Sequence, residues 1–186
     1  LITPVLAVDL VMGRSTPQSV LDPHYTVQPT GTAISADIYD RLVGFGLDLQ
    51  LKPALALSWE PVDDLTWEIK LRPDVKFHDG SAFDANDVAY SLERATTMPD
   101  SPSPVVVNVA AVDHVEVIDD LTLRIVAKAP TPLLMNQIGQ IYIVPSETGE
   151  ATTADFNSGK AVIGTGPYKF QSWIPNEEVK VTANAD

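Results

Sequence analysis

The stretch that decides the fold runs from Trp67 to Leu92 and reads WEIKLRPDVKFHDGSAFDANDVAYSL. Apolar and polar residues alternate strictly at its start, and this period of two predicts a strand with one buried face. The apolar positions of that strand are Leu65, Trp67, Ile69 and Leu71. Asp79-Gly80 then predicts a turn, because glycine tolerates positive φ and aspartate can bond its own backbone.

A capped helix is expected directly after this turn. Asp84 is a good N-cap residue, and Asp87 follows three positions later, where a carboxylate suits the helix dipole. Phe83 and Val88 occupy the two positions of a hydrophobic staple. The local pattern therefore predicts a strand, a turn and a helix, with His78 and Asp79 in structural roles.

Composition narrows the class of protein. The chain has 186 residues, which is enough for one domain or parts of two, and 45% of them are hydrophobic, which suits a folded core. Its formal net charge is −13, which disfavours nucleic acid and anionic membrane surfaces as partners. Cysteine is absent from the sequence, so a disulfide framework and a thiolate metal site are excluded.

The first residues leave two readings open. The segment 1–7 is apolar and ends in Val-x-Ala, which is compatible with the tail of an export signal cut after Ala7 or with a short first strand. No run of eighteen apolar residues occurs, so a membrane-spanning segment is not expected.

Periodicity predicts the remaining elements. A strand is expected near 8–11 and a helix over 34–42, where Ile34, Ile38 and Leu42 recur every four residues. Residues 51–61 are expected to connect this helix to the next strand. A β-hairpin is predicted over 112–127, short helices over 133–138 and around Phe156, and paired strands over 168–173 and 178–182.

A search for reactive groups finds no catalytic motif. The three histidines, His24, His78 and His114, lie far apart, and Gly164-Thr165-Gly166 lacks the rest of a phosphate loop or dinucleotide fingerprint. Two pairs of adjacent carboxylates, Asp63/Asp64 and Asp119/Asp120, keep open a secreted hydrolase, although such pairs more often cap turns. Binding is therefore favoured over catalysis, and no metal or cofactor is expected.

As a whole, the sequence resembles the family-5 extracellular solute-binding proteins, the peptide and nickel receptors of ABC importers. Trp67–Leu92 carries the main signature, and shorter matching elements occur in the family's order. They are Leu21-Asp22-Pro23, Ile38-Tyr39-Asp40-Arg41-Leu42-Val43, Pro53 to Glu60, Asp119-Asp120-Leu121-Thr122, and Gly164-Thr165-Gly166-Pro167-Tyr168-Lys169-Phe170.

The resemblance implies an α/β fold of the type-II periplasmic-binding kind. Lobe I, with a mixed sheet, would comprise residues 1–39 and 164–186, and residues 40–163 would form an inserted, β-rich α+β subdomain. Family members are much longer, so the second lobe is expected to be absent and the chain to be a truncated fragment.

The resemblance also implies a function. The protein would capture a peptide in the periplasm, with nickel complexes, opines or oligosaccharides as alternatives, and deliver it to an ABC permease in the inner membrane. It would be a monomer and not an enzyme. The cleft wall would come from Tyr25, Val27, Gln28 and Pro29, with a second, weaker contact at Ser103 and Val105.

Overall fold

The computed structural model describes residues 10–13, 15–98, 101 and 105–185. The segment 1–7, the beginning of the strand expected over 8–11, and Ser103 lie outside these residues. Leu10 and Val11 are described; they are exposed and outside any strand, so the predicted strand is not formed at these two positions.

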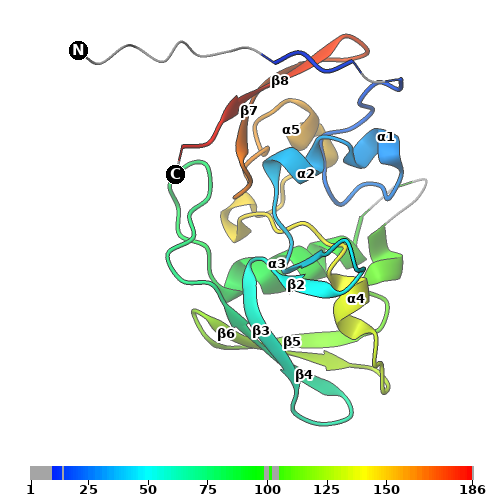
Figure 1. The fold of residues 1–186 in the computed structure, drawn as a ribbon, viewed down its shortest axis with the longest axis vertical. Helices are drawn as coiled ribbons and strands as arrows, with labels where there is room; N and C mark the ends of the chain where they lie inside the picture. Colours follow the sequence, from blue (N-terminus) through cyan, green and yellow to red (C-terminus); the bar gives the residue numbers. More distant parts are fainter. Residues whose placement is uncertain (1–9, 14, 99–100, 102–104, 186) are drawn as a thin grey trace.

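A four-stranded antiparallel sheet occupies the lower part of the molecule in Figure 1, with the strand order β3-β4-β6-β5. Strand β4 (Thr66–Leu71) lies between β3 (Ala56–Pro61) and β6 (Thr122–Ala127), and β5 (Val112–Asp119) forms the far edge. The strand and the hairpin that alternation predicted are confirmed. The segment 51–61, expected as a connection, instead forms β2 (Leu51–Pro53) and β3.

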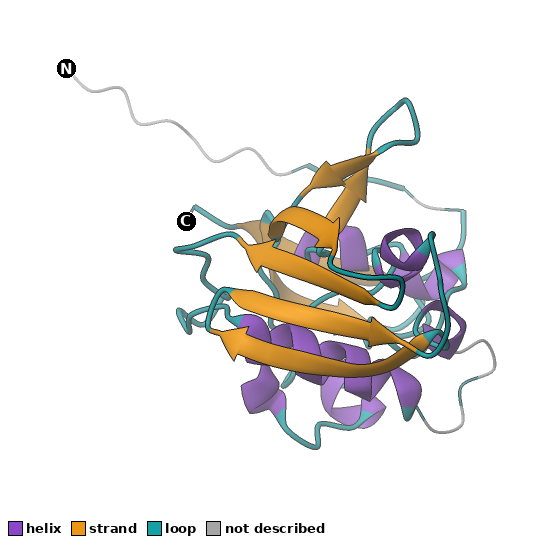
Figure 2. Cartoon of the chain, turned by 90° about the horizontal axis from the view of Figure 1, so that it is seen from below, coloured by secondary structure: helices purple, strands orange, loops and turns teal. Residues whose placement is uncertain are grey.

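Helix α3 (Ala85–Thr96) packs on this sheet, as Figure 2 shows. Asp84 caps it as predicted: its side chain accepts a hydrogen bond from the Asn86 N–H, and the Asp87 carboxylate accepts one from the Asp84 N–H at 2.8 Å. Phe83 and Val88 are both buried in the same core as Ile69 and Leu123. Gly80 has φ of +91°, so the Asp79-Gly80 turn uses the left-handed conformation that glycine favours.

The prediction of one helix over 34–42 is wrong. Only one helical turn, α2 (Ser35–Ile38), lies within that range, and it follows a separate turn, α1 (Pro29–Thr32). Tyr39 is extended, with φ of −117° and ψ of 149°. The cause is long-range pairing. The Ile38 carbonyl accepts a hydrogen bond from the Gly166 N–H at 2.9 Å, and the Asp40 carbonyl accepts one from Ile143 N–H at 2.9 Å.

Glycine is required where the 164–166 loop meets this turn. A Cβ on Gly164 would lie 2.0 Å from the Ile38 carbonyl oxygen, so a larger residue would displace the loop. The close contact holds the end of α2 against the start of the C-terminal hairpin, which comprises β7 (Tyr168–Ile174) and β8 (Glu178–Ala183).

The remaining elements are short. A small hairpin pairs β1 (Val43–Phe45) with β2, and the predicted short helices appear as α4 (Leu134–Ile138) and α5 (Thr153–Asn157). Short 3₁₀ helices cover Val105–Asn108 and Ser146–Thr148. All strand pairs among the described residues are antiparallel, so the mixed sheet stays a prediction.

The buried apolar residues form two clusters, one on each side of α3. The larger cluster fills the space between the four-stranded sheet, α3 and α4. The smaller one joins Leu21, α2, Tyr142, α5 and the inner face of β7-β8. Helix α3 therefore lies between two differently built regions (Figure 1), and its polar face decides how they are joined.

Candidate functional site

The turn at Leu21-Asp22-Pro23 is built around the carboxylate of Asp22. Its Oδ1 atom accepts a hydrogen bond from the His24 N–H at 3.0 Å, and its carbonyl accepts one from Tyr25 N–H at 3.3 Å. Proline at the second position of the turn supplies the φ angle that such a turn needs. The turn leads directly to Tyr25, which is half-buried.

A buried ion pair anchors this turn to helix α3. Arg94 donates from Nη1 to Asp22 Oδ1 at 2.9 Å and from Nη2 to Asp22 Oδ2 at 2.7 Å, and the two side chains are 8% and 0% exposed. Burial alone would raise the pKa of Asp22, but the hydrogen bonds and charge of Arg94 outweigh it and lower that pKa. The pair is therefore ionised, and each partner depends on the other.

His24 completes the polar cluster in its neutral form. Arg94 Nη1 donates to Nδ1 of the imidazole at 3.0 Å, so the proton lies on Nε2, which donates to the Tyr142 carbonyl at 2.7 Å. Burial and the neighbouring Arg94 charge lower the pKa of His24 to about 4. The three side chains together form what we call the Asp22 cluster: Asp22, His24 and Arg94.

The Asp22 cluster also positions the segment that enters α5. Thr153 Oγ1 donates to Asp22 Oδ2 at 2.8 Å, and Arg94 Nη2 donates to the Ala151 carbonyl at 3.2 Å. The Leu21 N–H donates to Asn157 Oδ1 at 2.9 Å, and the Arg94 guanidinium lies 4.5 Å from the centre of the Phe156 ring. Three segments far apart in sequence are thus fixed around one buried carboxylate.

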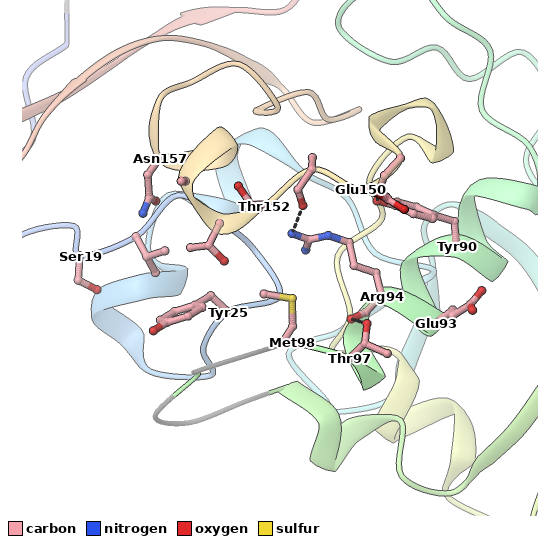
Figure 3. A pocket seen from close by; sticks show the side chains of 15 residues that line it. Ser19, Tyr25, Tyr90, Glu93, Arg94, Thr97, Met98, Glu150, Thr152 and Asn157 are labelled. Carbon is pink, nitrogen blue, oxygen red and sulfur yellow. Dashed lines mark hydrogen bonds between the residues drawn. The ribbon is translucent and has the colours of Figure 1, made fainter.

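An open groove of about 960 Å³ lies over this cluster (Figure 3). Its walls come from the turn, from the C-terminal half of α3 and from the 149–157 segment. The lining residues are Ser19, Val20, Tyr25, Tyr90, Glu93, Arg94, Thr97, Met98, Gly149, Glu150, Ala151, Thr152, Thr153, Ala154 and Asn157. In Figure 3, Tyr25 and Ser19 lie on one side of the groove and Tyr90, Glu93 and Glu150 on the other. Its volume matches that of a small-molecule site.

The structure places the site residues predicted from sequence in different surroundings. Tyr25 lines the groove, while Val27, Gln28 and Pro29 are exposed beside it at the start of α1. Val105 is only 4% exposed and packs in the larger apolar cluster, so its side chain offers little surface to a ligand. The sequence reading missed the groove residues of α3 and 149–157; the one local signal there is the capping box that Thr152 and Asp155 form at α5.

His78 joins two other predicted motifs. Its Nδ1 accepts a hydrogen bond from the Gly164 N–H at 3.3 Å, and its Nε2 donates to the Gly166 carbonyl at 2.9 Å. Burial lowers the pKa of His78, so its neutral form is favoured. This histidine connects the Asp79-Gly80 turn to the glycine-rich loop, as its structural assignment predicts.

The adjacent carboxylates act as turn caps. Asp63 Oδ1 accepts hydrogen bonds from Leu65 N–H and Thr66 N–H, each at 2.8 Å, and Asp119 Oδ1 accepts one from Leu121 N–H at 2.9 Å. These backbone bonds lower the pKa of Asp63 and of Asp119, which is the opposite of what a general acid requires. Neither pair lines the groove.

Two further searches concern the described residues alone. No helix in this part of the chain is long and apolar enough to cross a membrane. Over residues 10–13, 15–98, 101 and 105–185, histidine, aspartate and glutamate side chains form no group of three that could hold a metal ion.

The fold is shared with solute receptors of known structure. The chain superimposes on NikZ from Campylobacter jejuni, solved in complex with Ni(L-His), with a TM-score of 0.78 at 30% identity over 91% of this chain and 34% of that one. It also superimposes on the oligopeptide-binding protein AppA from Bacillus subtilis, solved with a nonapeptide, with a TM-score of 0.80 at 25% identity over 91% of this chain and 35% of that one. The fold of the chain is therefore that of the type-II periplasmic-binding proteins.

Sequence comparison gives the family. A profile of the bacterial extracellular solute-binding proteins, family 5 (middle region) matches residues 50–186, so the chain belongs to this family. It is 34% identical over 176 residues to the glutathione-binding protein GsiB of Pectobacterium atrosepticum, covering 94% of this chain and 34% of that protein. The chain thus spans about a third of the length of the curated relatives it matches.

Proposed function

We propose that the protein is the substrate-binding component of an ABC importer, which captures a peptide or a similar small solute in the periplasm and delivers it to an inner-membrane permease. The observation that carries the proposal is the agreement of family and fold: the family-5 profile and the superposition on NikZ together span most of the chain. Relatives described as binding glutathione, Ni(L-His) and a nonapeptide support a small solute with peptide-like chemistry.

Within that protein, this chain supplies one wall of the binding site. The larger apolar cluster is built from residues within 40–163, which supports an inserted subdomain there, with lobe I formed by 1–39 and 164–186. The smaller cluster joins the two proposed parts, because it also contains Tyr142, Val144 and Phe156. The groove and the adjoining surface at Tyr25, Val27, Gln28 and Pro29 form the ligand-facing part of the chain, because a groove of about 960 Å³ opens beside the turn at Leu21-Asp22-Pro23, one of the elements that match the family.

The Asp22 cluster has a positioning role in this account. Binding needs a wall whose shape is set before the ligand arrives, since ordering loops on binding costs affinity. The Asp22–Arg94 pair and its hydrogen bonds fix the 21–25 turn, the end of α3 and the 151–157 segment relative to one another. A ligand therefore meets a groove whose walls are already assembled.

Ligand stabilisation of a form of the protein that reaches the length of its relatives tests this proposal. Thermal unfolding is followed with tripeptides, glutathione and Ni(L-His), and the solute is recovered afterwards and identified by mass spectrometry. A receptor gains roughly 3 kcal/mol of stability at a ligand concentration of 100 Kd and returns the ligand unchanged. Conversion of the solute would support the hydrolase reading instead, and the absence of stabilisation by all of these solutes would refute the proposed receptor function.

A further inference from the structure

The groove over the Asp22 cluster contains a single basic side chain, Arg94, among its lining residues. A receptor for anionic solutes would use that guanidinium to bind a carboxylate. In this structure, however, the four terminal N–H groups of Arg94 are already bonded within the protein and its charge is paired with Asp22, so the net charge of the groove is set by other residues.

The hydrogen-bond count of Arg94 shows this. Nη1 carries two hydrogens and bonds Asp22 Oδ1 and His24 Nδ1, while Nη2 carries two and bonds Asp22 Oδ2 and the Ala151 carbonyl. All four terminal N–H groups are therefore used, and the positive charge is balanced by the Asp22 carboxylate. A ligand anion would find no free terminal N–H group at Arg94 without breaking the Asp22 cluster.

Most hydroxyl donors of the groove are committed as well. Thr152 donates to Asp155 Oδ2 at 2.7 Å, Thr153 donates to Asp22 Oδ2, and the Tyr90 hydroxyl donates to the Gly149 carbonyl. Thr97 donates to the Arg94 carbonyl at 3.3 Å. The wall of the groove is thus poor in free donors.

Two negatively charged carboxylates remain available at the rim of the groove. Glu93 on α3 and Glu150 before α5 are both exposed, and neither forms an ion pair with any residue that the structure describes. They lie on the same side of the groove as Tyr90, with the Tyr25 ring on the opposite side (Figure 3). Carboxylates and the faces of aromatic rings both attract organic cations.

From these observations we infer that the groove selects a cationic group of the solute, an ammonium or a guanidinium, and disfavours anionic solutes. The inference rests on the proposed function and specifies its substrate class. Ammonium and guanidinium groups bring the donors and the charge that the lining lacks, whereas a carboxylate would face Glu93 and Glu150 with no free cation to bind it. The negative net charge of the chain acts in the same direction over longer distances.

Three tripeptides of equal length test the inference: trilysine, trialanine and triglutamate. Each is titrated by calorimetry into a form of the protein as long as its family relatives, and into variants of that form. We expect the order of affinity trilysine, trialanine, triglutamate at low salt. Glu93→Gln and Glu150→Gln should each weaken trilysine binding roughly 2- to 5-fold, the range for an exposed ion pair, with a smaller effect on trialanine. Raising the salt concentration should narrow the differences among the three peptides.

Glu177→Gln is the matched control, because Glu177 is an exposed carboxylate in the β7–β8 turn, outside the groove. It should leave all three affinities unchanged. The double reversal Glu93→Lys with Glu150→Lys should invert the preference between trilysine and triglutamate, and thermal unfolding without peptide checks that each variant is folded.

The outcomes separate the two proposals. If trialanine or glutathione binds but trilysine holds no advantage over triglutamate, or if the Glu93 and Glu150 variants keep the wild-type ratio, the receptor function stands and the charge selectivity is wrong. If folded protein binds none of these peptides, the proposal of a peptide receptor fails and the inference fails with it.

Discussion

The two regions on either side of α3 are held together by different kinds of interaction. Below α3, the four-stranded sheet encloses an almost wholly apolar cluster that includes Ile69, Leu92 and Leu123. Above it, a smaller apolar cluster surrounds the buried, charged Asp22 cluster. Apolar packing tolerates small changes of shape, whereas a buried ion pair leaves an uncompensated charge when either partner is lost. The groove belongs to the second region, so its geometry should depend on a few polar contacts.

Arg94→Ala should produce the largest effect. It leaves Asp22 buried without a partner and removes the contact with Phe156, so we expect a loss of about 3–5 kcal/mol in the free energy of unfolding. Urea unfolding followed by tryptophan fluorescence measures it. Arg124→Ala is the matched control, since Arg124 pairs with Glu68 on the outer face of the sheet and is 39% exposed; it should cost at most about 1 kcal/mol. Equal losses in the two variants would remove the distinction between the regions.

His24 should make the upper region sensitive to acid. Its pKa is about 4 in the folded protein and about 6.5 when unfolding exposes the ring. As pH falls below about 6.5, the unfolded state binds a proton that the folded state does not bind until about pH 4. The free energy of unfolding should therefore decrease with falling pH across this window, by roughly 3 kcal/mol in total.

Urea unfolding at several pH values between 4.5 and 7 tests this in the wild type, His24→Gln and His78→Gln. The free energy of unfolding of the His24 variant should depend less steeply on pH, because unfolding of this variant takes up close to one proton fewer than unfolding of the wild type. His78, whose pKa is also lowered, should contribute in the same direction but less, because it is only partly buried. An unchanged slope in His24→Gln would show that the buried imidazole is not the acid-sensitive group.

Asp84→Ala should have a smaller effect, confined to the lower region. The Asp84 side chain caps α3 through the Asn86 N–H, and loss of an N-cap costs about 0.5–2 kcal/mol. Asp87 still accepts from the Ser146 N–H at 2.7 Å, so the start of the helix stays attached. Thermal unfolding measures the loss, and Asn86→Ala, which keeps the capping carboxylate, is the control. A stability equal to wild type would remove Asp84 from the capping role.

Sequence reasoning succeeded where local rules decide the structure. Strand β4, the Asp79-Gly80 turn, the capped helix α3 and the β5-β6 hairpin follow from alternation, turn chemistry and capping over short distances. It failed at 34–42, where Ile34, Ile38 and Leu42 have helical spacing but the Gly164–Gly166 loop and the 141–143 segment pair with the backbone. A local sequence pattern cannot show that these distant segments compete with a helix for the same backbone groups.

The candidate site was predictable only in part for the same reason. Tyr25 came from the resemblance of the Leu21-Asp22-Pro23 element to the family, and it does line the groove. Arg94 and Asp22 are 72 positions apart, and Thr153 and Asp22 are 131 apart, so nothing in their local sequence indicates that they meet. The free carboxylates Glu93 and Glu150 are recognisable only once the partners of Arg94 are known.

We propose that this chain forms one preassembled wall of a solute site, and that high affinity needs contacts from the rest of a receptor of the family's length. A two-lobed receptor excludes water from the ligand and contacts it from both sides, so one wall alone should bind poorly. One tripeptide is titrated by calorimetry into residues 1–186 and into a form of the protein as long as its family relatives. Circular dichroism establishes that both proteins are folded. We predict at least roughly 100-fold weaker binding by residues 1–186, a difference of about 2.7 kcal/mol. Equal affinity in the two proteins would show that the binding determinants lie within residues 1–186 and would contradict the account.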